Sequence, residues 1–161
     1  MSARHQIRIG VIGPHRATAE QSALAEAVGA EIARRGAVLV CGGLGGVMEA
    51  AARGAKSAGG LTIGVLPGDD AQGANPFVDI PIVTGMGEAR NVIIVRTCHA
   101  LIAIGGAYGT LSEMAFALRA GKPLVGLGTW QMRSPDDTAP PILTAESAAE
   151  AVAKAFQALG R

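Results

Sequence analysis

Short apolar runs rich in valine, isoleucine and leucine alternate with longer alanine-rich stretches along almost the whole chain. A strand buried on both faces of a parallel sheet needs such a run, and the crossover to the next strand needs a helix-length segment. The alternation therefore predicts an α/β fold, with a doubly wound sheet of six or seven mostly parallel strands and helices on both faces. No solenoid-type repeat, low-complexity tract or linker interrupts the pattern, so residues 1–161 are expected to form a single domain.

The turn residues between these stretches set the bounds of the expected elements. Six segments are predicted as strands: Ile7–Ile12, Val38–Val40, Thr62–Leu66, Ile80–Val83, Ala100–Ile104 and Leu124–Leu127. Five segments are predicted as helices: Thr18–Arg35, Val47–Ala58, Glu88–Cys98, Thr110–Ala120 and Ala145–Leu159. Thr18 and Gln21 have capping-box spacing at the start of the first helix, and Thr144 is expected to cap the last one.

The predicted helix Glu88–Cys98 carries few polar residues. A helix that is apolar over most of its surface is buried in the core or against another chain. We therefore expect this helix to lie at a subunit interface, in a homodimer or a higher homo-oligomer.

Charge and cysteine usage exclude several classes of partner. The chain has 14 basic and 13 acidic residues, a net charge of +1 and no basic run, so we expect no nucleic-acid partner. No apolar stretch reaches the roughly 18 residues that a membrane span needs, and the polar start Met1–Gln6 does not resemble a signal peptide. Cys41 and Cys98 lie in apolar runs without CxxC spacing, which favours buried, reduced thiols and a cytoplasmic protein.

Three glycine-bearing loops follow predicted strands, at Gly10–Gly13, Cys41–Gly46 and Gly105–Gly109. In a parallel α/β sheet the loops at the carboxyl ends of the strands form the ligand crevice. Glycine lets backbone N–H groups approach an anion, and the N-terminus of the following helix adds a partial positive charge. The three loops together predict a phosphate site. The alternative is that the glycines only allow tight turns with positive φ.

Several common nucleotide-binding and catalytic motifs are absent. No GxGxxG follows the first strand, and the second ends at Val40-Cys41 instead of an acidic residue, so a nicotinamide cofactor is poorly supported. The one Gly-Lys pair, Gly121-Lys122, runs into Pro123, which excludes a P-loop. There is no GxSxG nucleophile elbow, and the three histidines lack the spacing of metal ligands: His5, His15 and His99. We therefore expect no required cofactor and no metal.

Three side chains near the last glycine loop could carry chemistry. Thr110-x-x-Glu113 has capping-box spacing, in which Glu113 would only accept a hydrogen bond from the Thr110 N–H. Alternatively, Glu113 lies beneath a phosphate loop, where its carboxylate could stabilise positive charge at C1′ of a ribose or position water. Arg90 follows the Gly85-Met86-Gly87 turn and suits bidentate contact with a phosphate. The alternative for Arg90 is a salt bridge to Glu88 or another surface acid.

At these residues the chain resembles the LOG family, nucleoside 5′-monophosphate phosphoribohydrolases of Rossmann-like fold that were long mislabelled as lysine decarboxylases. The stretch Ile104–Glu113 resembles the family's PGGxGTxxE motif, with Ile104 in place of the proline. Val40–Met48 resembles the family's glycine-rich turn, and Ile63–Pro67 resembles its IGVIP strand. The resemblance runs over nearly the whole chain and implies a single LOG-like, nucleotide-binding domain with a Rossmann-like sheet.

The resemblance also implies roles for individual residues. In the family an arginine from an M-x-x-R-K segment and the glutamate of PGGxGTxxE form the catalytic pair, which corresponds to Arg90 and Glu113 here. Asn91 stands in place of the lysine. Segments of the form GxxRN and IGGxxGTLSE are similar to those of the molybdenum cofactor carrier proteins, a branch that binds a pterin phosphate and need not cleave it.

Two functions follow from these patterns. The first is binding of a nucleotide-like phosphorylated small molecule, alone or with hydrolysis of the N-glycosidic bond of a nucleoside 5′-monophosphate. The second is a non-catalytic carrier or sensor of a pterin (molybdenum cofactor) phosphate or a nucleotide phosphate. Recognition of the base or ring would depend on the loops Pro14–Arg16 and Asp69–Phe77. The residues expected to contact the ligand or its phosphate are Gly13, Gly42, Gly43, Gly45, Gly46, Met86, Arg90, Asn91, Gly105, Gly106, Tyr108, Gly109 and Thr110.

Overall fold

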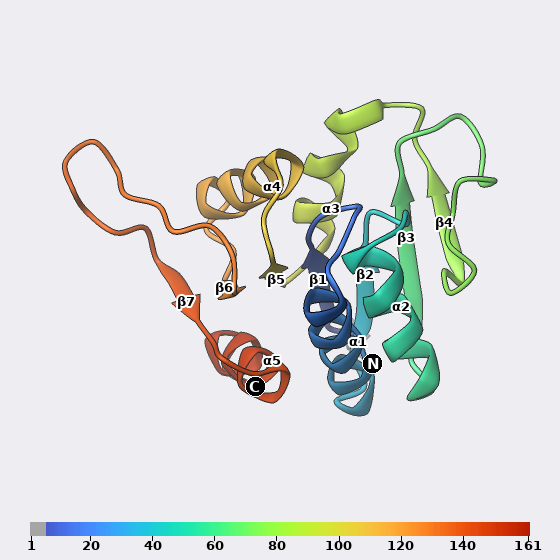
Figure 1. The fold of residues 1–161 in the computed structure, drawn as a ribbon, viewed down its shortest axis with the longest axis horizontal. Helices are drawn as coiled ribbons and strands as arrows, with labels where there is room; N and C mark the ends of the chain where they lie inside the picture. Colours follow the sequence, from blue (N-terminus) through green and yellow to red (C-terminus); the bar gives the residue numbers. More distant parts are fainter. Residues whose placement is uncertain (1–5) are drawn as a thin grey trace, which may run out of the picture.

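A computed structural model describes residues 6–161 as one sheet of seven parallel strands (Figure 1). The rest of the polar start, residues 1–5 with His5, lies outside the described residues. The strands are β1 (Arg8–Ile12), β2 (Val38–Cys41), β3 (Thr62–Leu66), β4 (Ile80–Val83), β5 (Ala100–Ile104), β6 (Leu124–Leu127) and β7 (Ile142–Thr144). The doubly wound α/β fold expected from the alternation is therefore confirmed.

Helices cover both faces of the sheet. They are α1 (Ala19–Arg34), α2 (Val47–Ser57), α3 (Asn91–Thr97), α4 (Tyr108–Arg119) and α5 (Ala148–Ala158), with a 3₁₀ turn, η1 (Gly87–Arg90), before α3. One apolar cluster lies between the sheet and the helices α1, α2 and α5. A second lies between the sheet and α3 and α4, on the opposite side in Figure 1. Both Cys41 and Cys98 are buried and unpaired, as expected.

The predicted strands agree with the observed ones, but three helix starts differ. The short strand β7 was missing from the six predicted segments. Helix α4 begins at Tyr108, two residues before the predicted start. Helix α5 is capped by the Ser147 side chain, which accepts from the N–H of Glu150, so the prediction of Thr144 as the cap was wrong. The predicted Glu88–Cys98 helix is divided into η1 and α3.

Helices α1 and α2 approach each other closely because each has a glycine at the contact. A Cβ on Gly29 would lie 1.9 Å from the carbonyl oxygen of Ala51, and a Cβ on Gly54 would lie 1.9 Å from that of Glu26. Backbone therefore packs against backbone, and any larger side chain would force the helices apart. The capping box of Thr18 and Gln21, which fixes the start of α1, is present as predicted.

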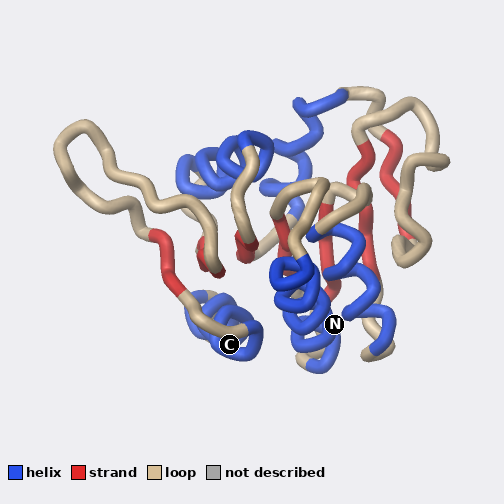
Figure 2. The backbone as a smooth tube through the Cα atoms, viewed as in Figure 1, coloured by secondary structure: helices blue, strands red, loops and turns tan. Residues whose placement is uncertain are grey.

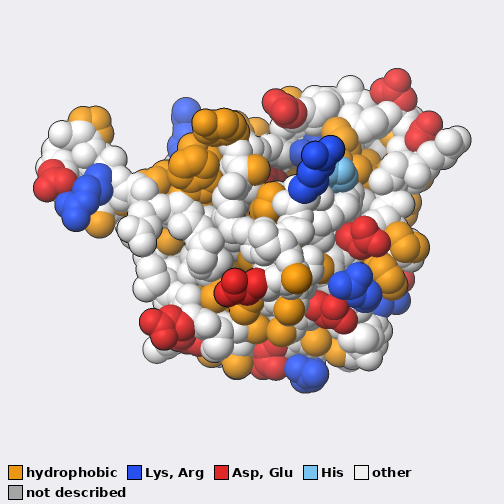
Figure 3. Space-filling view, in the orientation of Figure 1, with side chains coloured by type: hydrophobic (Ala, Val, Ile, Leu, Met, Phe, Trp, Pro, Cys, Tyr) orange, Lys and Arg blue, Asp and Glu red, His pale blue; other side chains and the backbone are white. Residues whose placement is uncertain are grey.

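The strand order is β4-β3-β2-β1-β5-β6-β7, so the direction of winding reverses between β1 and β5. Ligand crevices in open α/β sheets form at this switch, beyond the carboxyl ends of the strands. A loop between β6 and β7 projects from the body of the molecule (Figure 2). Acidic and basic side chains are scattered over the face in Figure 3 and form no continuous basic surface there. Within the part of the chain that is described, no helix is long and apolar enough to cross a membrane.

Candidate functional site

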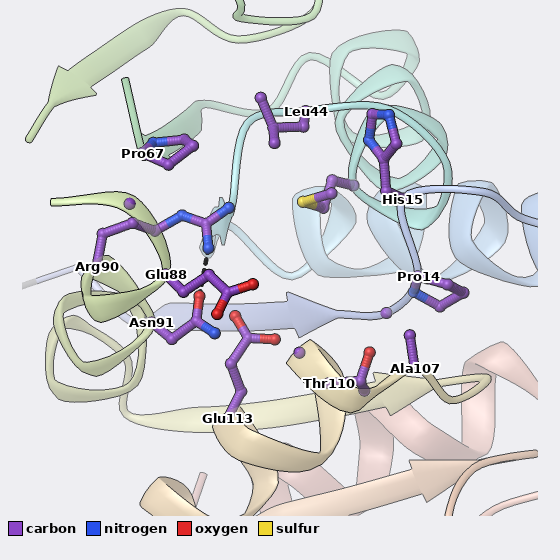
Figure 4. A pocket seen from close by; sticks show the side chains of 14 residues that line it. Pro14, His15, Leu44, Pro67, Glu88, Arg90, Asn91, Ala107, Thr110 and Glu113 are labelled. Carbon is purple, nitrogen blue, oxygen red and sulfur yellow. Dashed lines mark hydrogen bonds between the residues drawn. The ribbon is translucent and has the colours of Figure 1, made fainter. Parts of the chain in front are cut away.

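A pocket of about 340 Å³ lies at the switch between β1 and β5 (Figure 4). It is lined by residues that follow β1, β2, β3 and β5, and by the turn η1. The lining residues are Gly13, Pro14, His15, Leu44, Met48, Pro67, Gly87, Glu88, Arg90, Asn91, Ala107, Gly109, Thr110 and Glu113. The fold thus brings Arg90, Glu113 and Thr110 together from segments that are about twenty residues apart in the chain.

The N-terminus of α4 opens into this pocket without a cap. The N-cap residue Ala107 has no side chain to accept from the helix, and within residues 6–161 the backbone N–H groups of residues 106–110 have no acceptor. The hydroxyl of Thr110 is also without a hydrogen-bond partner, although the residue is only 2% exposed. Figure 4 shows this hydroxyl pointing into the pocket. Free amides and a buried free hydroxyl at a helix N-terminus are suited to an anion.

The capping-box alternative for Thr110 and Glu113 is wrong. Because α4 begins at Tyr108, Thr110 lies in the first turn and Glu113 in the second. Neither side chain makes a capping hydrogen bond. Glu113 is instead 7% exposed, with its carboxyl group at the pocket wall.

The glycine loop Gly42–Gly46 is less open to a ligand than the sequence suggested. The Gly45 N–H donates to Nδ1 of His15 at 3.2 Å, and the Val47 N–H donates to the carbonyl of Pro14 at 3.1 Å. The Gly43 N–H lies 3.4 Å from the sulfur of Cys41. The loop therefore binds to the neighbouring β1 loop, and its exposed contribution to the pocket comes from Leu44 instead of the glycines.

Arg90 is only 8% exposed, and hydrogen bonds hold its guanidinium in one position. Its Nε donates to the carbonyl of Val65 at 3.0 Å, and its Nη1 donates to Oδ1 of Asn91. A Cβ on Gly42 would lie 2.9 Å from Nη2, so this glycine leaves room for the guanidinium. No ion pair between Arg90 and Glu88 occurs within residues 6–161, which contradicts the salt-bridge alternative. Burial lowers the pKa of Arg90, and the carboxyl of Glu113 opposes that shift.

Asn91 connects the arginine to helix α4. Its Oδ1 accepts from Arg90, and its Nδ2 donates to Oγ of Ser112 at 3.1 Å. Ser112 in turn donates to the carbonyl of Gly109 at 2.7 Å. Asn91 is 4% exposed and its bond to Arg90 is buried, whereas the bond from Ser112 to Gly109 is exposed. A lysine at this position could not accept from Arg90, because an ammonium group has no acceptor.

Glu113 has the most perturbed carboxyl in the pocket. Burial raises its pKa from 4.5 to about 8, and the positive charge of Arg90 opposes that shift. Within the described residues Glu113 forms no ion pair and no side-chain hydrogen bond. At a pKa of about 8 the carboxyl is mostly protonated at neutral pH, and it could donate a hydrogen bond as well as accept one.

Other expected contact residues lie outside the pocket lining. Tyr108 is 83% exposed and Met86 is 49% exposed, and neither lines the pocket. A Cβ on Gly105 would lie 2.5 Å from Nε2 of Gln21, and one on Gly106 would lie 2.7 Å from Nε1 of Trp130. These two glycines therefore allow neighbouring side chains to pack against the loop.

Several residues that line the pocket are not among the expected phosphate contacts. His15 and Pro14 belong to a loop that was expected to recognise the base or ring, whereas the other such loop, Asp69–Phe77, contributes no lining residue. Leu44, Met48 and Pro67 are apolar, and no sequence signal separates an apolar pocket residue from a core residue. The role of Ser112 was also missed, because it acts only through Asn91.

Known proteins resemble the chain at the level of sequence. A cytokinin riboside 5′-monophosphate phosphoribohydrolase of Mycobacterium tuberculosis is 38% identical over 122 residues, which are 70% of this chain and 65% of that protein. An uncharacterized protein of Archaeoglobus fulgidus is 53% identical over 121 residues, which are 75% of this chain and 80% of that one.

Solved structures resemble the chain over nearly its full length. The molybdenum cofactor binding protein of Rippkaea orientalis has a TM-score of 0.89 and 39% identity, with 99% of this chain and 100% of that chain covered. The molybdenum cofactor carrier protein of Chlamydomonas reinhardtii has a TM-score of 0.85 and 40% identity, with 97% and 100% covered. The DNA processing protein A of Streptococcus pneumoniae, at 19% identity and a TM-score of 0.70 over 92% of this chain and 61% of that one, shares the fold alone.

One protein family matches almost the entire chain. The SLOG cluster4 family matches residues 6–157, which include every described strand and helix except the last residue of α5, and all of the pocket residues. The chain therefore belongs to the SLOG cluster4 family.

Proposed function

We propose that the chain binds a small phosphorylated ligand in this pocket, with the phosphate at the N-terminus of α4. The observation that carries the proposal is the set of free N–H groups at residues 106–110 beside the buried, unpartnered hydroxyl of Thr110. Five amides and a hydroxyl supply the donors that phosphate oxygens accept, and the helix dipole adds a partial positive charge.

Arg90 adds the one full positive charge that lines the pocket. Its guanidinium is buried and oriented by Val65 and Asn91, so a ligand need not order it on binding. A phosphate placed between Arg90 and the α4 N-terminus would therefore meet donors from two sides.

We propose further that the ligand is a pterin phosphate of the molybdenum cofactor type and that the chain carries it without cleaving it. The two cofactor-binding proteins are 39% and 40% identical over almost the whole chain, which supports this assignment. Asn91 supports it as well, because it replaces the lysine of the phosphoribohydrolases. A largely protonated Glu113 also favours binding, since a neutral carboxyl stabilises a positive C1′ centre poorly.

Hydrolysis of the N-glycosidic bond of a nucleoside 5′-monophosphate is the second candidate. Arg90 and Glu113 line one pocket, and a relative with 38% identity is a phosphoribohydrolase. In this reaction ionised Glu113 would stabilise the positive charge at C1′ while Arg90 orients the ligand. Because only the ionised form acts, the rate should rise with pH up to about 8, the pKa of Glu113.

Two measurements separate the candidates. Isothermal titration with the fluorescent, oxidised form of molybdopterin should give tight binding, and removal of its phosphate should weaken that binding at least tenfold. Chromatography of AMP and other monophosphates incubated with the protein should detect no free base. Equal affinity for the phosphorylated and dephosphorylated forms would contradict the proposed site. Base release that disappears in Glu113→Gln would establish hydrolysis instead.

We also propose a cytoplasmic homodimer that is formed through the groove between α3 and α4. The groove is lined by Val92, Val95, Arg96, Phe116, Arg119 and Ala120. Phe116 is 39% exposed in this groove, so a second copy of the chain could bury its ring there. The two buried free thiols fit a reducing compartment. Sedimentation should give a dimer that Phe116→Glu dissociates, and a monomeric native protein would contradict this proposal.

A further inference from the structure

Two residues shortly after β6, Thr129 and Trp130, support the loop Gly105–Gly109 through hydrogen bonds. The hydroxyl of Thr129 donates to the carbonyl of Gly105, and the indole Nε1 of Trp130 donates to the carbonyl of Ala107 at 3.2 Å. Neither residue lines the pocket. Both belong to the start of the projecting loop between β6 and β7 in Figure 2.

These contacts fix the direction of two peptide groups. In a trans peptide the N–H of the next residue points away from the carbonyl, so fixing the Gly105 carbonyl also fixes the N–H of Gly106. The Ala107 carbonyl likewise fixes the N–H of Tyr108, and it accepts the first hydrogen bond of α4 from Leu111 at 3.0 Å. Thr129 therefore orients the N–H of Gly106, whereas Trp130 and the first turn of α4 together orient the N–H of Tyr108.

Packing restricts the two donors to this arrangement. A Cβ on Gly106 would lie 2.7 Å from Nε1 of Trp130, so the indole lies directly against the loop. The methyl of Thr129 packs on Gly126, where a Cβ would lie 2.8 Å from it. Trp130 also lies against Tyr108, with a distance of 6.0 Å between ring centroids. The chain has one tryptophan and one tyrosine, and they meet at this loop.

We propose that Thr129 and Trp130 are positioning residues for anion binding: they hold the Gly105 and Ala107 carbonyls outward so that the N–H groups of Gly106 and Tyr108 face the phosphate. This inference rests on the proposed phosphate site and adds the residues that preorganise it. Preorganised donors bind an anion more tightly because no carbonyl must rotate away from the incoming charge.

The test compares Thr129→Val with Thr129→Ser. Valine keeps the shape and the methyl contact but removes the hydroxyl, whereas serine keeps the hydroxyl. The melting temperature is followed against the concentration of inorganic phosphate at constant ionic strength, and the dissociation constant comes from the increase in melting temperature. The melting temperature measured without phosphate shows separately how much each substitution destabilises the fold. Trp130→Phe, which keeps a ring and loses the indole N–H, serves as a second variant.

We expect Thr129→Val and Trp130→Phe to bind phosphate about tenfold more weakly than the native protein, the usual effect of losing one orienting hydrogen bond. Thr129→Ser should match the native protein. If phosphate stabilises Thr129→Val and Trp130→Phe as much as it stabilises the native protein, the positioning role is overturned and the phosphate site stands. A native protein that phosphate does not stabilise would overturn the site, and the positioning role with it.

Discussion

The side chains that decide the chemistry of the pocket differ in how they are held. Arg90 is fixed by Val65 and Asn91, whereas Thr110 and Glu113 have no hydrogen-bond partner of their own within the described chain. A buried polar group without a partner costs free energy in the empty protein. A ligand that supplies the missing partners would recover that cost, so these two residues support the proposed binding site better than the glycines do.

Glu113 should make the stability of the protein depend on pH. Its folded pKa of about 8 exceeds the ordinary value of 4.5, so the folded protein binds more protons than the unfolded chain between these values. The free energy of unfolding should therefore fall as the pH rises from 5 to 8, by on the order of a few kcal/mol. The free energy of unfolding of Glu113→Gln, measured in urea, should not show this fall. Its difference from the native value should therefore shift in favour of the variant as the pH rises to about 8. Parallel curves for the two proteins would show that the carboxyl is ionised in the pocket.

Asn91 should affect both protein stability and ligand affinity, because it orients Arg90. Asn91→Leu keeps the branching at Cγ but removes the acceptor of Arg90 and the donor to Ser112, so it should destabilise the protein by about 1–3 kcal/mol. It should also weaken binding of a phosphorylated ligand more than binding of the dephosphorylated form. Ser112→Ala is the matched control, because it breaks only the distant end of the chain. Equal affinities for the native protein and Asn91→Leu, measured by isothermal titration, would disprove the orienting role.

At the scale of elements, helices α1 and α2 depend on two glycines. Gly54→Ala would place a Cβ where the carbonyl oxygen of Glu26 lies, and should lower the free energy of unfolding by about 1–3 kcal/mol or more. An ordinary glycine-to-alanine change inside a helix acts in the other direction, by up to about 1 kcal/mol. Gly109→Ala in α4, whose Cβ meets nothing within 4 Å, is therefore the control. If urea unfolding showed Gly54→Ala to be stabilised like the control, the close helix contact would be wrong.

The bounds of the strands were predictable from the sequence, but the details of the helix ends were not. Apolar runs bounded by glycine and proline mark the six longer strands, whereas β7 has three residues and follows two prolines. Helix α4 starts at Tyr108 after the uncapped Ala107, so the capping-box spacing of Thr110 and Glu113 was misleading. Spacing alone does not reveal which residue begins the first turn.

The choice between glycine loops also lay beyond the sequence. Both Gly42–Gly46 and Gly105–Gly109 have the composition of an anion loop. Only the fold places His15 and Pro14 against the first loop, about thirty residues away in the chain, where they accept from the N–H of Gly45 and from that of Val47, which follows the loop. The sequence did predict Arg90, Asn91, Glu113 and Thr110 as site residues, and the fold places all four at one pocket.

At the scale of the whole molecule, the switch in strand order explains why these residues meet. Strands β1 and β5 are neighbours although they are about ninety residues apart, so the loops after them lie side by side at the carboxyl edge of the sheet. Residues that follow β2 and β3 complete the pocket on one side, and Thr129 and Trp130 support the loop Gly105–Gly109 on the other. The sheet thus collects donors from distant segments around the proposed anion site.

The central claim is that an anion binds at the N-terminus of α4. The most direct measurement is a titration of the ¹⁵N-labelled protein with inorganic phosphate, followed through the chemical shifts of its backbone amides. We predict that the largest shifts occur at Gly106, Ala107, Tyr108, Gly109 and Thr110 and saturate together. Shifts confined to the amides of Gly42–Gly46, or no saturable shift at the start of α4, would contradict the account.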